Sequence, residues 1–523
     1  MAHVLGLDAS TQSFSAVILD TVSGRICGEA SVNFGAELPD YNQPNGYDPT
    51  GQSGEVHANP LMWLEALDLL LARMAEDGVD LGSIDAVSGS GQQHGSVYLN
   101  QNFGRCLAEQ SSAPDLKTAL SSCFSRPSAP IWMDSSTKPE CSEIADTLGS
   151  TQIVCQRSGS IPIERFTGPQ IRKFFKNDRS AYAQTEQIHL VSSFFASVLS
   201  GRSVAIDHGD GAGMNLMNLA AKDWDPELLS ATAEGLAEKL PPCRPSGTVC
   251  GKISSYFVEK YGFNKNCQTI LWSGDNPCSL VGMGAASPGE VVISLGTSDT
   301  LFAAMDEPLS DPKGYGHVFG NPLGGYMSLI CFKNGSLARE AIKDAFGLDW
   351  SAFEIQALAR TEPGNDGLMM LPFYEPEITP TADTNGPVYS DEREISAEAA
   401  ARAVLEGQFL NMRTHAAWMG LAPKRISLTG GASQNDGIAQ IVADIFGLPV
   451  DRLNVPGSAA VGAAIRAAVA IGHNREALEA DFCRAEPGRT IEPNTEARAR
   501  YDAILPVFQS FLEKHVASPA SQS

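Results

Sequence analysis

The sequence predicts an α/β protein built from two lobes. At 523 residues the chain is longer than one ordinary hydrophobic core accommodates, so two or more domains are expected. Strand-like and helix-like patterns alternate in stretches such as 425–450, which is typical of α/β lobes. A strand, turn, strand pattern opens each half of the chain, at residues 3–20 and 288–305. The two segments have little sequence similarity, but their shared order of strand, turn and strand indicates two related lobes.

The expected elements follow from local patterns along the chain. Residues 3–20 read as two apolar strands around a polar turn, and residues 84–100 read as strand, Gly-rich turn, strand. Residues 59–78 show the apolar spacing of a helix and end on a glycine. Polar loops and short helical runs alternate over much of 101–270. The tail after about residue 475 is polar and then amphipathic, which predicts a peripheral helix.

Composition narrows the class of protein. Hydrophobic residues make up 43% and charged residues 19% of the chain, as in a globular protein. The N-terminus has no basic segment before Asp8, so no signal peptide is expected, and the most apolar later stretch is interrupted by Arg466. The net charge of -24 argues against nucleic-acid or membrane partners. Eleven scattered cysteines without a CxxC pair favour reduced thiols in the cytoplasm.

Several common nucleotide and metal motifs are absent or broken. The chain has no GxxxxGK[ST] P-loop, and "SGSGQQHG" has His94 where a GxGxxG motif needs its third glycine. The segment "DHGDGAGMNLMN" has acids at its first and fourth positions and no Glu at the twelfth, so it is not an EF-hand calcium loop. Zinc, Rossmann and P-loop chemistry are therefore excluded.

Three turns rich in small residues remain as candidate anion sites. They are "GLDAST" (6–11), "LGTSDT" (295–300) and "TGGASQN" (429–435). Each could present backbone N–H groups and hydroxyls to an anion, although each one alone also fits a simple turn. Three in one chain, two of them opening the two halves, favour a split nucleotide site.

A carboxylate and an amide lie side by side in "ILWSGDNPCSL", residues 270–280. Asp275 and Asn276 come where an apolar run ends and a helix-like stretch starts at Pro277. From these residues alone, Asp275 could cap the helix or face a substrate.

Nine segments in order resemble the FGGY family of carbohydrate kinases, and within it the eukaryotic-type xylulose kinases. They are "GQQHGSVYL", "WMDSST", "RFTGPQI", "DHGDGAGMNL", "GDNPCSLVGM", "SLGTSDTLF", "CFKNGSL", "LEGQF" and "TGGASQN". The resemblance implies two ribonuclease-H-like lobes of the actin/hexokinase type around a central cleft. It assigns the sugar and the catalytic base to residues 1–286, the nucleotide to 287–475 and a helical tail to 476–523.

The resemblance also implies a reaction and its catalytic groups. ATP would donate its γ-phosphoryl group with Mg²⁺ present, and Asp275 would be the general base, with Asn276 holding a neighbouring hydroxyl. Asp8 would bind Mg²⁺ together with Asp275, although Asp8 could instead stabilise its turn. The family often has Gly after this Asp, whereas Ala9 follows here, so the backbone geometry of the turn is expected to differ slightly.

For the sugar, the resemblance points to a second group of residues. A lone His is commonly a core residue, but the glycines around "QQH" favour an exposed turn at a strand end. Asp207 and Asp210 could line the pocket or be structural loop acids, and these alternatives stay open. The expected sugar-site residues are Gln93, His94, Trp132, Asp134, Arg165, Asp210, Asp275 and Asn276.

For the nucleotide, glycines would let the backbone approach the ligand closely. Asn435 could contact the base or cap a helix, Trp350 could lie beside the adenine or in the core, and "RAVLEGQF" is assigned packing only. The expected nucleotide-site residues are Ser10, Thr11, Gly296, Thr297, Ser298, Trp350, Gly430, Gly431, Ser433 and Asn435.

The expected substrate is D-xylulose, giving D-xylulose 5-phosphate. One alternative is another ketose or polyol kinase of the family, acting on ribulose, glycerol or arabitol. Another is a non-catalytic, actin-like sugar sensor or assembly protein, which would not need the hydroxyl-reading residues. The expected partner is a small sugar, and the expected state is a monomer or homodimer.

Overall fold

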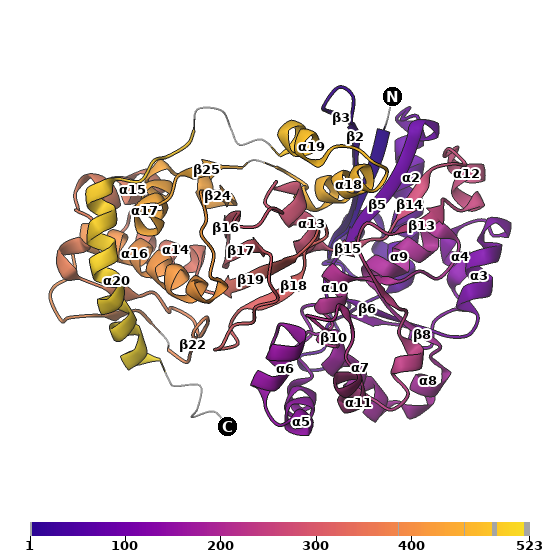
Figure 1. Ribbon diagram of the computed structural model, residues 1–523, viewed down its shortest axis with the longest axis horizontal. Helices are drawn as coiled ribbons and strands as arrows, with labels where there is room; N and C mark the ends of the chain where they lie inside the picture. The colour runs from indigo at the N-terminus through magenta and orange to yellow at the C-terminus, as the bar shows by residue number, and fades with distance from the viewer. Residues whose placement is uncertain (1–2, 385, 454, 484–488, 517–523) are drawn as a thin grey trace. The chain divides into compact units, whose positions relative to one another are not determined.

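The computed structural model describes residues 3–384, 386–453, 455–483 and 489–516, and the chain forms two compact units (Figure 1). The first unit contains residues 1–286, 318–327 and 455–483. The second contains residues 287–317, 328–454 and 484–523. The first unit thus includes residues 318–327 and 455–475, which the sequence division placed in 287–475, and residues 476–483, which it placed in the tail. The division into sugar-binding and nucleotide-binding domains remains a prediction. No helix among the described residues has the length and apolar character needed to cross a membrane.

A seven-stranded mixed sheet forms the centre of the first unit. Its order is β13-β14-β5-β1-β2-β3, and the short β15 also pairs with β5. Strand β1 runs antiparallel to β2 and parallel to β5. The predicted strands in 3–20 and 84–100 are confirmed. The strands of this sheet are β1 His3–Ala9, β2 Ser13–Asp20, β3 Arg25–Asn33, β5 Ile84–Gly91, β13 Val249–Lys252, β14 Gln268–Ile270 and β15 Ser273–Gly274, and β6 Ser96–Leu99 lies in a separate two-stranded sheet.

Helix α2 shows how the local sequence sets an element of this unit. The Asn59 side chain accepts the Leu61 N–H, and Pro60 occupies the first helical position, where its missing N–H costs nothing. Trp63 and Leu67 are buried on its apolar face. The helices of this unit are α1 Phe34–Glu37, α2 Pro60–Glu76, α3 Phe103–Glu109, α4 Leu116–Leu120, α5 Lys138–Leu148, α6 Thr151–Ser158, α7 Thr167–Asn177, α8 Arg179–Gln184, α9 Val191–Ser200, α10 His208–Ala212, α11 Pro226–Thr232, α12 Ser255–Tyr261, α13 Asp275–Gly282, α18 Ser458–Ala470 and α19 Arg475–Phe482.

Helix α18 lies against β1, β5 and α13 in the first unit (Figure 1). Its small residues permit close backbone contact. A Cβ on Gly462 would come within 1.9 Å of the Cys278 carbonyl oxygen, and one on Gly6 would come within 1.9 Å of the Ala460 carbonyl oxygen. The small residues in 458–470 therefore let α18 pack closely on both α13 and β1.

The second large sheet has the order β18-β19-β17-β16-β24-β25. Strand β16 runs antiparallel to β17 and parallel to β24. The strands predicted within 288–305 and 425–450 are confirmed. The strands are β16 Val291–Leu295, β17 Asp299–Met305, β18 His317–Gly320, β19 Tyr326–Phe332, β24 Ile426–Thr429 and β25 Val450–Arg452. The helices of the second unit are α14 Ser336–Ala345, α15 Trp350–Ala359, α16 Ala397–Ala416, α17 Asp436–Phe446 and α20 Thr495–His515.

The two sheets share a topology, and this accounts for the repeat in the sequence. The order β3-β2-β1-β5-β14 in one matches β19-β17-β16-β24-β25 in the other. In each, the first strand pairs with the second across a three-residue turn, 10–12 or 296–298, and lies parallel to a third. The shorter strands are β4 His57–Ala58, β7 Ala129–Pro130, β8 Gln187–Leu190, β9 Ile206–Asp207, β10 Met217–Asn218, β11 Asp223–Trp224, β12 Cys243–Arg244, β20 Met370–Leu371, β21 Glu377–Ile378, β22 Thr381–Ala382 and β23 Val388–Tyr389.

Candidate active site

The first candidate site lies at the carboxyl ends of parallel strands in the first unit. The register places Asp8 of β1 beside Ser90 of β5, and Ser90 beside Ser273 of β15. Two residues after Ser273 the chain enters α13 at Asp275. Ligands of open α/β sheets commonly bind at this edge, because the chain leaves the sheet there and its loops are free to vary.

Asp275 is held by donors from two segments. Its Oδ1 accepts the Asn276 backbone N–H at 2.8 Å, the Asn276 side-chain amide at 3.1 Å and the Gln93 backbone N–H at 3.3 Å. The N-cap of α13 is Gly274, so Asp275 is not the helix cap that the sequence left open. A Cβ at Gly274 would lie 2.3 Å from Cγ of Gln93. Glycine here lets Gln93 approach the start of the helix.

Two carboxylates influence each other at this site. Burial, and then the nearby charge of Asp8, raise the pKa of Asp275 to about 7, against backbone N–H groups that lower it. Burial also raises the pKa of Asp8, opposed by the hydroxyls of Ser10 and Ser90. Asp275 remains partly exposed, whereas Asp8 is buried. A carboxylate with a pKa near neutral suits general-base chemistry.

Asp8 and Asp275 fit a hard cation. Ser10 donates to one oxygen of Asp8, whereas the buried Oδ1 of Asp8 has no hydrogen-bond partner in the part of the chain that the structure describes. A cation would satisfy that oxygen and relieve the repulsion between the two carboxylates. The described residues contain no cluster of three or more His, Cys, Asp or Glu that could hold a metal. The oxygen atoms of these two carboxylates are the donor type that Mg²⁺ takes.

Gln93 and His94 lie in the turn between β5 and β6. The Gln93 side-chain oxygen accepts the Asn276 amide at 2.8 Å. His94 has φ 69° and contacts the Gly213 carbonyl oxygen through Nδ1 at 2.8 Å. The turn was predicted correctly, but its exposure was not. His94 is buried, with its ring 4.6 Å from that of Phe166, a residue far away in the sequence.

The surroundings of His94 keep it neutral. Burial, and then the positive charge of Arg165, lower the pKa of His94 to about 3. Since Nδ1 faces a carbonyl oxygen, it must carry the proton, and Nε2 is left as an acceptor. Arg165 is half-buried, with its guanidinium 5.6 Å from the Phe166 ring centre. His94 thus offers a hydrogen-bond acceptor at Nε2, and Arg165 offers a positively charged guanidinium near it.

The two residues from "WMDSST" have different surroundings. Trp132 is 45% exposed, and its indole N–H donates to the Thr11 hydroxyl at 2.8 Å. Asp134 is buried and accepts the Val56 backbone N–H at 3.0 Å and the Gln170 amide at 2.7 Å. Burial raises the pKa of Asp134, but its hydrogen bonds outweigh this and hold it below the usual value. In this arrangement Asp134 supports the loop around Val56.

The structure separates the two acids of "DHGDGAG". Asp207 is the N-cap of α10 and accepts the backbone N–H groups of Gly209 and Asp210. Asp210 accepts only the Ser192 hydroxyl, at 2.5 Å, among the described contacts of its side chain, and its Oδ1 is buried without a partner. Burial, and then the charge of Asp207, raise its pKa well above the usual value. Asp207 is thus the structural loop acid, and Asp210 is the candidate site residue.

Arg466 was not identified as a site residue from the sequence, although it interrupts an apolar run. Its guanidinium is buried and donates to the carbonyl oxygens of Leu271 at 2.7 Å, Ser246 at 3.0 Å and Gly89 at 3.3 Å. It also lies 3.2 Å from the sulfur of Cys278 in α13. This cation ties the strands that carry the site to the helix that begins at Asp275.

In the second unit, the turn 296–298 links β16 to β17, as 10–12 links β1 to β2. Thr297 and Ser298 are exposed at its apex. Gly430, which follows β24, has φ 89°, and a Cβ there would lie 2.3 Å from the Leu295 carbonyl oxygen. The two glycine-containing turns therefore meet at the carboxyl ends of β16 and β24.

The remaining nucleotide candidates resolve two open alternatives. Ser433 is buried and donates to the Gly430 carbonyl oxygen at 2.7 Å. Asn435 is the N-cap of α17, and it also donates to Glu354 at 2.9 Å. Trp350 is 45% exposed at the start of α15, so it is not a buried core residue. Gly431 is exposed, and a Cβ there would meet no atom within 4 Å.

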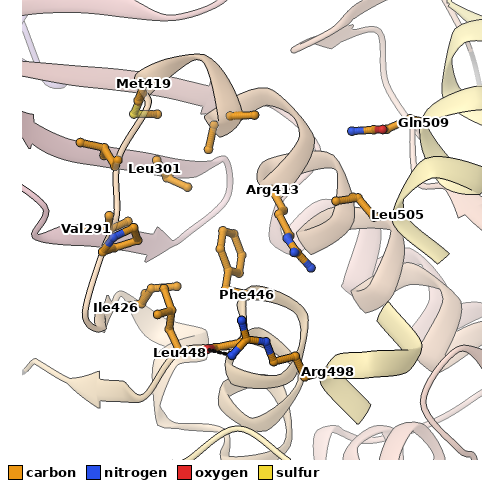
Figure 2. A pocket seen from close by; sticks show the side chains of 15 residues that line it. Val291, Leu301, Arg413, Met419, Ile426, Phe446, Leu448, Arg498, Leu505 and Gln509 are labelled. Carbon is orange, nitrogen blue, oxygen red and sulfur yellow. Dashed lines mark hydrogen bonds between the residues drawn. The ribbon is translucent and has the colours of Figure 1, made fainter. Parts of the chain in front are cut away.

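A separate cavity of about 450 Å³ in the second unit contains none of the expected residues (Figure 2). It lies at the opposite ends of the strands, where β16 starts at Val291 and β24 starts at Ile426. Figure 2 shows Phe446 and the guanidinium groups of Arg413 and Arg498 at its wall. It is therefore distinct from the candidate nucleotide site.

Comparisons with known proteins define the class to which this fold and these turns belong. Residues 127–282 match the N-terminal domain, and residues 291–471 the C-terminal domain, of the FGGY family of carbohydrate kinases. The chain belongs to this family and is an ATP-dependent sugar kinase.

Two relatives within this family are xylulose kinases. The chain is 41% identical over 527 residues to a xylulose kinase of Rattus norvegicus, covering 99% of this chain and 97% of the relative. It is 42% identical over 486 residues to xylulose kinase 2 of Arabidopsis thaliana, covering 89% and 86%.

Solved structures of more distant sequences share the fold. A xylulose kinase from Rhodospirillum rubrum superposes with a TM-score of 0.82 at 19% identity, covering 98% of each chain. A gluconate kinase from Lactobacillus acidophilus gives a TM-score of 0.82 at 21% identity, covering 100% of each chain. The predicted two-lobed, actin/hexokinase-type α/β fold is confirmed.

Proposed function

We propose that this kinase transfers the γ-phosphoryl group of ATP to D-xylulose and forms D-xylulose 5-phosphate and ADP. Two xylulose kinases of different kingdoms, each more than 40% identical over most of the chain, support this choice of sugar. The other ketoses and polyols named above remain the alternatives to be tested against it.

The observation that carries the mechanism is the position of Asp275. Its carboxylate is fixed by Asn276 and Gln93, and burial together with Asp8 raises its pKa to about 7. At neutral pH a substantial fraction is therefore ionised and able to accept a proton. This supports Asp275 as the general base.

The proposed step is a single displacement at phosphorus. Asp275 accepts the proton of the 5-hydroxyl, the hydroxyl oxygen forms a bond to the γ-phosphorus, and the bond from that phosphorus to the β–γ bridging oxygen breaks. The bond electrons leave with ADP, and the proton stays on Asp275 until solvent removes it. Asp8 and Asp275 would hold Mg²⁺, which would neutralise charge on the phosphate oxygens.

Sugar recognition is assigned to hydroxyl-reading groups of the first unit. Nε2 of neutral His94 would accept a hydroxyl, while Arg165 and the amide of Asn276 would donate to others. Gln93 has a buried side-chain nitrogen without a partner among the described residues, and it would gain one from a sugar oxygen. Asp210 and Trp132 complete this proposed set.

Nucleotide recognition is assigned to the turns, with Ser10 and Thr11 as further phosphate contacts. Thr297 and Ser298 would donate to phosphate oxygens from the turn that begins at Gly296. We place the nucleoside at Gly430 and Gly431, with Trp350, Ser433 and Asn435 nearby. We retain the assignment of the sugar and base to 1–286, the nucleotide to 287–475 and a helical tail to 476–523, and we propose a cytoplasmic location.

The function is tested by measuring ADP release with Mg-ATP and a panel of D-xylulose, D-ribulose, L-ribulose, glycerol and D-arabitol. Turnover should be highest on D-xylulose, and Asp275→Ala should lower it on the order of 100-fold or more. Asp146→Ala removes an exposed carboxylate of α5 and serves as the matched control. Highest turnover on another polyol would replace the substrate, and turnover without sugar dependence would contradict the proposed reaction.

A further inference from the structure

A buried ion pair lies directly beneath the turn 296–298. Arg339 of α14 donates from Nη1 to Oδ2 of Asp299 at 2.8 Å and from Nη2 to Oδ1 at 3.0 Å. Arg339 is 1% exposed and Asp299 is fully buried. Two parallel bonds between a guanidinium and a carboxylate fix the orientation of both groups. The carboxylate is therefore rigidly placed where β17 starts.

This carboxylate holds the first residue of the turn. Oδ1 of Asp299 accepts the Gly296 N–H at 3.2 Å. The Gly296 carbonyl oxygen in turn accepts the Ser336 N–H at 2.9 Å and lies 3.5 Å from Nη2 of Arg339. Both backbone groups of Gly296 are thus engaged from below. Thr297 is left exposed at the apex of the turn, free to face a ligand.

Gln408 extends the network to α16. Its side-chain oxygen accepts from Nη1 of Arg339 at 3.0 Å, and its amide nitrogen donates to the carbonyl oxygens of Asn334 at 2.6 Å and Gly335 at 2.8 Å. A Cβ on Gly335 would lie 2.7 Å from the Thr297 carbonyl oxygen, so that segment packs tightly under the turn. The segments "SLGTSDTLF", "CFKNGSL" and "LEGQF" thus meet in one cluster.

Stability alone is a poor explanation for this cluster. Removing two charges from water is costly, and well-packed apolar residues often stabilise a core equally well. Arg339 itself is buried, and its described contacts reach the turn through Asp299 and the Gly296 carbonyl oxygen. Rigid placement of donors before the ligand arrives does, by contrast, favour binding and transfer of a charged group.

We propose that Arg339 is a positioning residue for ATP, which through Asp299 and Gln408 holds the turn 296–298 in its phosphate-binding shape. This inference rests on the proposed function, since it takes that turn to bind phosphate. It assigns to Gln408 and its helix a role beyond the packing expected from the sequence.

The test compares Arg339→Lys with Arg402→Lys. Both changes keep a buried positive charge and remove a guanidinium that binds a carboxylate in the second unit, since Arg402 pairs with Glu406 at 2.8 Å. The Arg402 guanidinium bonds to Glu406 and to the Tyr501 hydroxyl, so Arg402→Lys controls for general destabilisation. We would measure Mg-ADP binding by calorimetry and KM for ATP and for D-xylulose, at a temperature where circular dichroism shows folded protein.

The expected result for Arg339→Lys is a rise in KM for ATP and in Kd for Mg-ADP on the order of 10-fold. KM for D-xylulose and the constants of Arg402→Lys should stay within about two-fold of wild type. Nucleotide constants equal to those of Arg402→Lys would overturn the inference and leave the ion pair purely structural. Wild type that fails to bind Mg-ADP would overturn the nucleotide function itself, which is a distinguishable result.

A second variant, Gln408→Met, tests the same network if Arg339→Lys does not fold. Gln408→Met keeps both members of the ion pair and the side-chain volume but removes the bonds of Gln408 to Arg339, Asn334 and Gly335. We expect it to weaken Mg-ADP binding about 3-fold with D-xylulose KM unchanged. Unchanged Mg-ADP affinity in this variant would contradict the network's role.

Discussion

Asp275 shows how neighbours set the chemistry of a residue. An ordinary aspartate has a pKa near 4 and is a weak base, whereas burial and the charge of Asp8 raise the pKa of this one to about 7. The same contacts that place its carboxylate, from Gln93 and Asn276, also oppose the shift. Position and basicity are therefore set by the same few residues.

This pKa makes the reaction depend on pH. A base must be ionised, so kcat/KM for D-xylulose should rise with pH and level off at or below about pH 7, because bound Mg²⁺ would offset the Asp8 charge that helps to raise this pKa. The measurement is kcat/KM between pH 5.5 and 9 with Mg-ATP saturating. A profile that stays flat over the whole range from pH 5.5 to 9 would contradict the assignment of Asp275 as the base.

Gly274 gives a second prediction at this scale. In Gly274→Ala, the new Cβ would lie 2.3 Å from Cγ of Gln93 and 3.0 Å from Oδ1 of Asp210, so the Gln93–Asn276 bond must shift. We expect kcat/KM for the sugar to fall on the order of 10- to 100-fold. Gly247→Ala, where a Cβ meets no atom within 4 Å, should change it by less than about two-fold and is the matched control. Equal effects would show that close approach at Gly274 is unimportant.

At the scale of elements, the contact between α18 and α13 sets where the base lies. Gly462 of α18 packs on the Cys278 carbonyl of α13, and Gly282 of α13 packs on the Ser458 carbonyl of α18. Arg466 of α18 also donates hydrogen bonds to the carbonyl oxygens of Gly89 in β5 and of Leu271. A displacement of α18 would therefore move the start of α13 as well.

The substitution Gly462→Ala tests this contact. The added methyl would meet the Cys278 carbonyl oxygen at 1.9 Å, which the backbone relieves only by moving apart. We expect the free energy of unfolding, measured by thermal unfolding, to fall by about 1–3 kcal/mol, and turnover to fall as well. Gly104→Ala in α3, where a Cβ meets nothing within 4 Å, should instead be neutral or gain up to about 1 kcal/mol. A stable and fully active Gly462→Ala variant would contradict the close packing.

Many of the helices, strands and turns could be predicted from the sequence, because each one depends on a local pattern of residues. The hairpins opening each half, the helix near residues 60–76 and the turns at Gly296 and Gly430 were all expected. The ion pair of Asp299 and Arg339 was not, since its members lie 40 positions apart and no local pattern joins them. The prediction that His94 lies in an exposed turn was wrong for the same reason, because Phe166, from a distant segment, packs against its ring.

At the scale of the whole molecule, buried neutral histidines make the fold sensitive to acid. Burial lowers the pKa of His94 and of His189 to about 3. Unfolding exposes both, so the unfolded chain binds more protons below about pH 6.5. Their contribution to stability is intact above that pH and is lost as the pH falls toward 3.

His189 allows this to be measured away from the active site. It is fully buried and contacts Ser193, Gln187 and Ser203. Between pH 6.5 and 5.5, His189→Gln should lose about 1.0 kcal/mol less free energy of unfolding than wild type, because the unfolded His189 is already half protonated at pH 6.5. Urea unfolding followed by tryptophan fluorescence at the two pH values gives this difference. The same loss in both proteins would contradict the prediction.

Phosphoryl transfer by Asp275→Asn in a single turnover tests the account most directly. The amide keeps the shape of the side chain but cannot accept the proton of the sugar hydroxyl. With enzyme in excess over Mg-ATP and D-xylulose saturating, we predict transfer on the order of 100-fold slower than wild type in rapid-quench experiments. The Kd for D-xylulose should change less than about three-fold. A single-turnover rate equal to wild type would contradict Asp275 as the base of a xylulose-phosphorylating kinase.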